Sequence, residues 1–216
     1  MEKYKYNIDK MFTYLRAFCV GARLIQSVIA LNFARDAHAG QTRKDGVPYI
    51  VHPLSMACYA IALGIKDDNI ISTILLHDVA EDCGIGIDDL PVNDIVKTGC
   101  KYMTVTKFDN DKSKIETKRR YFNELLESRE AIITKGFDRY NNLTDMAFAL
   151  SDEAIGKNCA ETEVLLLPVL KKAKEKWIDL SDIFFILRTN IRSVNDILKL
   201  YNEEQYIIYK EKYEKE

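Results

Sequence analysis

Helical periodicity runs through almost the whole chain, and it constrains the fold more than any other feature. No segment alternates apolar and polar residues over a length that would need a β-sheet. Only four prolines and nine glycines interrupt the 216 residues, which suits helices joined by short connections. The sequence therefore predicts an all-α protein, with helices over 8–39, 53–63, 67–82, 92–102, 115–126, 131–150, 162–177 and 180–209. The densely charged residues 201–216 are expected to fray.

Composition limits the classes of partner. The chain is 47% hydrophobic and 30% charged, which is typical of a soluble globular protein. Its net charge of -2 gives no general support for binding to nucleic acid or to a membrane surface. No uncharged apolar stretch of about 18 residues predicts a membrane span.

The N-terminal region and the cysteines predict a cytoplasmic protein. The most apolar N-terminal segment, residues 17–33, carries Arg23 and Gln26 and is typical of an amphipathic helix rather than a signal peptide. The five cysteines are odd in number, widely spread and without a C-x-x-C pair, so we expect free thiols in a reducing compartment.

An apolar run from Ile74 is broken by four polar residues: His77, Asp78, Glu81 and Asp82. Residues three and four apart share a helix face, so these side chains are expected to converge. Three carboxylates and an imidazole on a mostly buried helix repel one another unless a cation lies among them. We interpret them as a divalent metal site with carboxylates left over for acid–base chemistry. The alternative for His77 and Asp78 is a hydrogen-bonded pair in the core.

His52 precedes Pro53, a residue that often begins a helix, so we expect His52 at the N-cap or just before it. A side chain at a helix entrance can project into a site. Considered alone, His52 would more simply be a surface cap, and Asp138 alone carries little signal. The order of several short motifs along the chain links His52 and Asp138 to His77 and Asp78.

Five stretches follow one another along the chain: AHAGQTRKDG (37–46), PYIVHPL (48–54), LLHDVAED (75–82), VTK (105–107) and KGFDRYNNL (135–143). In this order they resemble the hydrolase domain of RelA/SpoT-type alarmone enzymes, a branch of the HD phosphohydrolase superfamily. The resemblance covers residues 20–150. It implies an HD-type helical bundle as the core over 1–150, with C-terminal helices over 151–216 packed on that core or extending it.

The resemblance also implies roles for individual residues. Two imidazoles and two carboxylates match the family's manganese ligands, a set that suits manganese or iron better than structural zinc. An acidic pair matches the residues that position or deprotonate the attacking water. Basic residues and an asparagine match groups near the nucleotide, and a further lysine is a weaker candidate for charge neutralisation. The metal ligands are His52, His77, Asp78 and Asp138; the acidic pair is Glu81 and Asp82; the substrate-binding residues are Arg43, Lys44, Asn142 and Lys107.

The function implied is manganese-dependent removal of the 3′-pyrophosphate from guanosine tetra- or pentaphosphate, giving GDP or GTP and pyrophosphate. Gly136, Phe137 and Asn141 depart from the family's usual residues, so a phosphatase acting on another nucleotide, such as NADPH, stays open. The long helical segment after residue 150 keeps a non-catalytic alarmone-binding module open too. Trp177 and the aromatic residues after it are expected in the core, with self-association into a homo-oligomer as the alternative.

Overall fold

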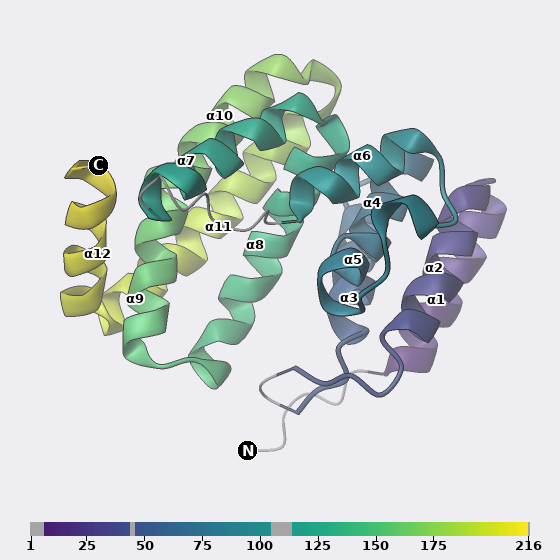
Figure 1. Cartoon of the computed structure of the whole chain (residues 1–216), viewed down its shortest axis with the longest axis horizontal. Coiled ribbons are helices and arrows are strands. Elements are labelled where there is room, and N and C mark those ends of the chain that lie inside the picture. The colour runs from purple at the N-terminus through teal and green to yellow at the C-terminus, as the bar shows by residue number, and fades with distance from the viewer. Residues whose placement is uncertain (1–6, 44–45, 105–113, 216) are drawn as a thin grey trace. The chain divides into compact units, whose positions relative to one another are not determined.

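The computed structural model describes residues 7–43, 46–104 and 114–215. Two candidate substrate-binding residues, Lys44 and Lys107, lie outside these described residues. The chain divides into two compact units, Met1–Thr104 and Val105–Glu216, and Figure 1 shows that both are helical. Within the described residues the β-structure amounts to one isolated bridge between Thr42 and Pro48. The all-α fold is therefore confirmed.

The first unit is built around helix α4 (Asp68–Leu76), which is buried except for its first two residues. Its helices are α1 (Ile8–Gly21), α2 (Ile25–Ala37), α3 (Val51–Ala62), α4 (Asp68–Leu76), α5 (Val79–Asp82), the short 3-10 helix η1 (Ile87–Asp89) and α6 (Asp94–Met103). Helix α4 packs against α2, α3 and α6 (Figure 1). Every residue from Ile70 to Leu76 is buried, as is typical of a helix without a solvent face. His77, which follows the C-terminal end of α4, therefore lies in the interior of the unit.

Two adjacent aspartates fix the start of this helix and its contact with α2. The Asp67 carboxylate caps α4 by accepting hydrogen bonds from the backbone N–H groups of Asn69 and Ile70. The Asp68 carboxylate accepts from the backbone N–H groups of Gln26 and Ser27, in the first turn of α2. Helix α2 has no side-chain cap of its own, so Asp68 satisfies donors that would otherwise lack a partner.

The prediction of one continuous helix over 67–82 is wrong. Helix α4 ends at Leu76, and Asp78 has φ -99° and ψ -7°, values outside the regular helical range. A separate turn follows, in which the Asp82 N–H bonds to the Asp78 carbonyl oxygen at 2.9 Å. The helical register is interrupted here. The three- and four-residue spacings between His77, Asp78 and Glu81 therefore do not place these side chains on one helix face.

The predicted position of His52 also needs correction. Helix α3 begins at Val51, so His52 lies within its first turn rather than at the cap. A preceding turn, with the His52 N–H bonded to the Tyr49 carbonyl oxygen at 2.9 Å, leads into the helix. Pro53 fits inside this first turn because the N–H that it lacks would have had no intrahelical partner.

The second unit packs long helices around α8 and α11. It contains α7 (Lys114–Glu124), the 3-10 helix η2 (Leu125–Glu127), α8 (Arg129–Ala149), α9 (Asp152–Glu161), the π-helical turn η3 (Thr162–Leu166), α10 (Leu167–Lys176), the 3-10 helix η4 (Ile178–Leu180), α11 (Ser181–Tyr201) and α12 (Glu203–Lys215). Helix α11 packs on α8, α9 and α10. Pro168 stands near the start of α10. Because proline cannot donate a backbone hydrogen bond, it favours the change of register at η3.

The C-terminal helix does not fray as the sequence predicted. Helix α12 packs along α9, and Tyr213 near its end is buried. The Arg119 guanidinium donates to the Tyr213 carbonyl oxygen at 2.6 Å and ties down this last turn. Burial of an aromatic ring stabilises the end of a helix whose local charge pattern alone would not.

Gly156 allows this close approach of α9 and α12. A Cβ added at Gly156 would lie 2.7 Å from the Tyr206 backbone nitrogen and 2.6 Å from the Gln205 Cβ. We therefore expect Gly156→Ala to lower the free energy of unfolding by about 2 kcal/mol, because backbone rather than a flexible side chain must move. Urea unfolding followed by circular dichroism measures this. Gly21→Ala is the control, since a Cβ there meets no heavy atom within 4 Å, and equal losses in both variants would contradict the explanation.

Glu163 couples η3 to the last two helices. Its carboxylate accepts from Lys199 Nζ at 2.6 Å and from Lys210 Nζ at 3.1 Å. Burial alone would raise the pKa of Glu163, but hydrogen bonds from Lys199, Tyr206 and Lys210 outweigh it and lower the pKa from 4.5 to about 2. The unfolded chain then binds more protons than the folded chain between these two pH values.

Stability is accordingly expected to fall as the pH is lowered from about 4.5 to about 2, as Glu163 becomes protonated. In Glu163→Gln this part of the pH dependence should flatten, and stability at neutral pH should be lower. Thermal unfolding across this pH range provides the measurement, with the exposed Glu175→Gln on α10 as the control. If stability falls as steeply with pH in Glu163→Gln as in the parent protein, groups other than Glu163 cause the loss of stability in acid.

No described helix is long and apolar enough to cross a bilayer. All five cysteines belong to the described residues and are free thiols, as expected.

Candidate metal centre

His77 follows directly after α4 and is held in one orientation. It is 2% exposed, and its Nδ1 lies 2.9 Å from the Ile74 carbonyl oxygen. A carbonyl oxygen can only accept a hydrogen bond, so Nδ1 carries the proton and Nε2 presents a lone pair when the ring is neutral. A histidine that ligates a metal through Nε2 commonly has its other ring nitrogen held in this way.

Asp78 and two histidines bring three potential ligand atoms together within the first unit. Asp78 Oδ2 lies 3.0 Å from His77 Nε2 and 3.6 Å from His52 Nε2. The two imidazole rings have their centroids 5.2 Å apart, and both are buried. Ligands bound about 2.1 Å from a cation at right angles to one another lie about 3 Å apart. These residues therefore fit a divalent metal ion.

Tyr49 is a member of this cluster that the sequence prediction missed. Its hydroxyl donates to Asp78 Oδ2 at 2.6 Å, and its ring stacks on His38 with centroids 4.7 Å apart. Burial and the nearby carboxylates of Asp78 and Asp82 raise the pKa of Tyr49 far above its usual value, so the hydroxyl keeps its proton. Tyr49 therefore acts as a fixed donor that orients the Asp78 carboxylate.

Tyr49→Phe should lower the affinity for a divalent cation by about 10- to 100-fold, the usual effect of losing a group that orients a ligand. Calorimetric titration of metal-free protein with Mn²⁺ measures this affinity. The control is Tyr14→Phe on α1, where the ring is 49% exposed. The role assigned to the hydroxyl fails if Tyr49→Phe binds Mn²⁺ as tightly as Tyr14→Phe.

The acidic pair lies beside the cluster but not in the interior. Glu81 and Asp82 are on the short helix α5, and both are exposed. The argument that their charges would repel on a buried helix is therefore wrong for these two residues, because α4 ends before them. Their exposure suits groups that meet water and a substrate instead.

Gln41 is a second residue that the prediction missed, and it links α5 to the loop after α2. Its side-chain amide donates to the Asp82 carbonyl oxygen at 3.2 Å, while its Oε1 accepts from His38 Nδ1 at 2.8 Å. His38 is 2% exposed, so this chain of hydrogen bonds is anchored in the interior. Both Gln41 and His38 therefore position their neighbours.

Two backbone hydrogen bonds hold Arg43 in place. Its backbone N–H bonds to the Val47 carbonyl oxygen at 2.8 Å, and its carbonyl oxygen accepts from Gly46 at 2.9 Å. Gly46 has φ +81°, a conformation that favours glycine. These bonds fix the backbone of Arg43, which lies between Gln41 and Tyr49 in the sequence.

In the second unit, Asp138 is buried on α8 and has partners on the same helix. Lys135 Nζ bonds to its Oδ2 at 2.7 Å, and Asn142 Nδ2 bonds to its Oδ1 at 2.5 Å. Burial alone would lower the pKa of Lys135, but the attraction of Asp138 outweighs it, so the pKa of Lys135 is raised. Asn142, predicted to contact substrate, here orients the Asp138 carboxylate.

Comparisons with known proteins identify the family to which the chain belongs. The chain matches the HD domain family over residues 30–162 and belongs to it. It is 32% identical over 165 residues to a probable guanosine-3′,5′-bis(diphosphate) 3′-pyrophosphohydrolase of Synechocystis, a match covering 72% of this chain and 21% of that protein. It is 30% identical over 165 residues to the bifunctional (p)ppGpp synthase/hydrolase RelA of Mycobacterium tuberculosis, covering 73% of this chain and 22% of that protein.

Among solved structures, a metazoan ortholog of SpoT described as hydrolysing ppGpp matches with a TM-score of 0.49 and 23% identity, over 84% of this chain and 93% of that chain. The chain spans about a fifth of the length of the curated relatives named above. The predicted membership of the HD superfamily is confirmed by the family match.

Proposed function

We propose that the protein is a metal-dependent hydrolase that removes the 3′-pyrophosphate of guanosine tetra- or pentaphosphate. The single observation that carries this proposal is the His52–His77–Asp78 cluster, with Asp78 Oδ2 3.0 Å from His77 Nε2. Relatives named as hydrolases of this nucleotide support the choice of substrate. The products would be GDP or GTP and pyrophosphate.

The ligand set of the proposal has four members. His52, His77 and Asp78 come from the first unit, and the family resemblance adds Asp138 as the fourth ligand. A divalent cation, when bound, neutralises phosphoryl charge and lowers the pKa of a water molecule. We propose Mn²⁺ as this cation, with Fe²⁺ as the alternative, because imidazole and carboxylate ligands together suit both.

The exposed acidic pair would act on the water. Glu81 is proposed as the general base that takes a proton from the attacking water, and Asp82 as the group that positions this water. Gln41 supports this arrangement by holding the Asp82 carbonyl oxygen. Arg43, Lys44 and Lys107 would neutralise the phosphates, and Asn142 would contact the ribose or phosphate end.

The domain assignment is part of the same proposal. We propose that residues 1–150 carry the hydrolase core and that 151–216 pack on it or extend it. The family match over residues 30–162 supports a core that includes α8, the helix of Asp138 and Asn142.

The experiment that tests the substrate compares two reactions of the purified full chain with Mn²⁺. Guanosine tetraphosphate should yield GDP and pyrophosphate, with no orthophosphate, as resolved by anion-exchange chromatography. NADPH is the matched alternative, because a phosphatase acting on it would release orthophosphate. Faster turnover of NADPH would overturn the proposed substrate, and tight binding of guanosine tetraphosphate without turnover of either compound would favour a binding module.

A further inference from the structure

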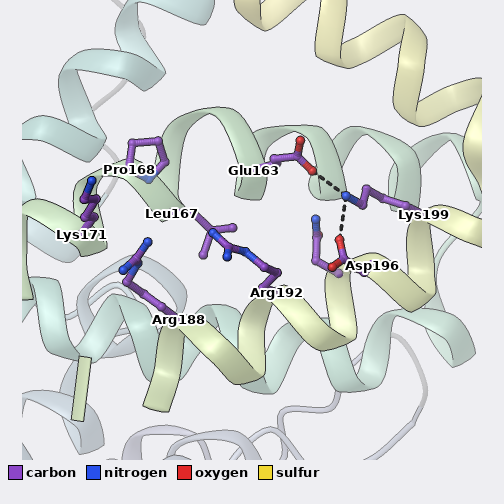
Figure 2. A pocket seen from close by; sticks show the side chains of 9 residues that line it. Glu163, Leu167, Pro168, Lys171, Arg188, Arg192, Asp196 and Lys199 are labelled. Atoms are coloured by element: carbon purple, nitrogen blue, oxygen red, sulfur yellow. Dashed lines mark hydrogen bonds and ion pairs between the residues drawn. The ribbon is translucent and has the colours of Figure 1, made fainter. Parts of the chain in front are cut away.

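A cavity in the second unit is lined by none of the candidate catalytic, metal-binding or substrate-binding residues. It has a volume of about 560 Å³, within the range of about 300–1,000 Å³ usual for small-molecule sites. Figure 2 shows that Arg188 and Arg192 extend from α11 toward the segment that carries Pro168 and Lys171. The lining residues are Glu163, Leu167, Pro168, Lys171, Arg188, Arg192, Asn195, Asp196 and Lys199.

The two ends of this cavity differ in charge. At one end Lys199 Nζ bonds both Glu163 and Asp196, at 2.6 and 2.7 Å, so the two acids are already paired (Figure 2). At the other end three cations, Lys171, Arg188 and Arg192, line the cavity. Arg188 and Arg192 are four apart on α11, a spacing at which like charges destabilise a helix. An anion bound between them would remove this repulsion.

Two polar atoms in the wall lack a hydrogen-bond partner among the described residues. Arg188 Nε is buried and has no acceptor there. Asn195 is 1% exposed, and its Nδ2 donates to the Cys159 carbonyl oxygen at 3.3 Å, which leaves Oδ1 without a donor. Because unsatisfied buried polar groups are costly, a ligand that supplied an acceptor for Arg188 Nε or a donor for Asn195 Oδ1 would be favoured.

We propose that this cavity is a second ligand site that binds a phosphorylated nucleoside. Its phosphates would lie against the Arg188 and Arg192 guanidiniums and Lys171, and a ribose hydroxyl would donate to Asn195 Oδ1. Guanidinium groups bind phosphate through paired, charge-assisted hydrogen bonds, which suits the two arginines. The apolar wall at Leu167 and Pro168 offers a surface for the rest of the nucleoside.

The test uses two probes, GDP and inorganic pyrophosphate, titrated into the full chain by calorimetry with EDTA present. Chelation of divalent cations keeps metal-dependent hydrolysis from contributing heat. Amide shifts of ¹⁵N-labelled protein identify which residues respond, and those on α10 and α11 are expected to move. GDP should bind more tightly than pyrophosphate, because only GDP carries a ribose hydroxyl for Asn195.

The variant R188Q/R192Q should weaken GDP binding at this site by at least about tenfold, the effect of losing charge-assisted hydrogen bonds. Hydrolase turnover should be unchanged, since neither arginine belongs to the candidate metal centre. K171Q and K172Q form a matched pair on neighbouring residues of α10, because Lys171 lines the cavity and Lys172 does not. K171Q should weaken binding and K172Q should not, which keeps the test valid even if the double variant fails to fold.

Three results would overturn the proposal. The first is that GDP causes no amide shifts on α10 or α11. The second is that R188Q/R192Q, or K171Q if the double variant does not fold, binds GDP as tightly as K172Q does. The third is that pyrophosphate binds as tightly as GDP, which would exclude a contact between the nucleoside and Asn195.

Discussion

Asp78→Asn is expected to lower metal-dependent turnover of guanosine tetraphosphate by at least about a thousandfold, the effect of removing a charged group from a preorganised site. Asparagine keeps the size of the side chain but loses the negative charge that a cation requires. Asp78 Oδ2 is also the atom that faces His52, His77 and Tyr49, so its charge is shared by the whole cluster. The measurement is kcat with saturating Mn²⁺.

The matched control for this prediction is Asp88→Asn. Asp88 is an exposed carboxylate of η1 in the same unit, and its removal should leave turnover within about twofold of the parent protein. Circular dichroism must show that both variants are folded. If Asp78→Asn retains full metal-dependent turnover, the proposed site is wrong.

Glu161→Leu is expected to lower the free energy of unfolding by about 3–5 kcal/mol, the usual cost of leaving a buried charge without its partner. Glu161 is 7% exposed, and its Oε1 accepts from Arg139 Nη2 at 2.7 Å. Its other oxygen is paired with Lys118. In the variant the buried Arg139 guanidinium keeps its hydrogen bond to the Asn158 amide oxygen on α9 at 3.2 Å, but an amide oxygen carries no charge.

Urea unfolding measures this loss, with Glu175→Leu on the exposed side of α10 as the control. The double variant R139M/E161L should recover part of the stability, because it removes both charges and replaces them with apolar groups of similar size. A free energy of unfolding for Glu161→Leu that matches the Glu175→Leu control would mean that the ion pair contributes nothing net.

The helical class and most of the helices could be predicted because periodicity reports directly on which face is buried. The break at His77 and Asp78 could not, because the apolar pattern continues across it and the change lies in the backbone dihedral angles of Asp78. The prediction for the end of the chain was wrong because a contact between residues far apart in the sequence decides its structure. Its charge pattern predicts fraying, whereas a distant contact between Arg119 and the Tyr213 carbonyl oxygen stabilises it.

The candidate site could be predicted in part. Charged residues and imidazoles stand out in a sequence, so His52, His77 and Asp78 were found, and within the first unit they do lie together. Tyr49 and Gln41 were missed although both lie inside the motifs, because tyrosine and glutamine are common without function. Their signal is the loop that folds them back onto Asp78 and Asp82, and only three-dimensional structure reveals it.

The most direct test of the central claim is a titration of metal-free protein with Mn²⁺ while pyrophosphate release from guanosine tetraphosphate is followed. Turnover should be absent without the metal and should rise to a plateau at one equivalent of Mn²⁺ per catalytic site. Tyr49→Phe should shift this curve to higher Mn²⁺ concentration, and Asp78→Asn should abolish it. Pyrophosphate release that is independent of metal, or no release from protein shown by elemental analysis to be loaded with Mn²⁺, would contradict the account.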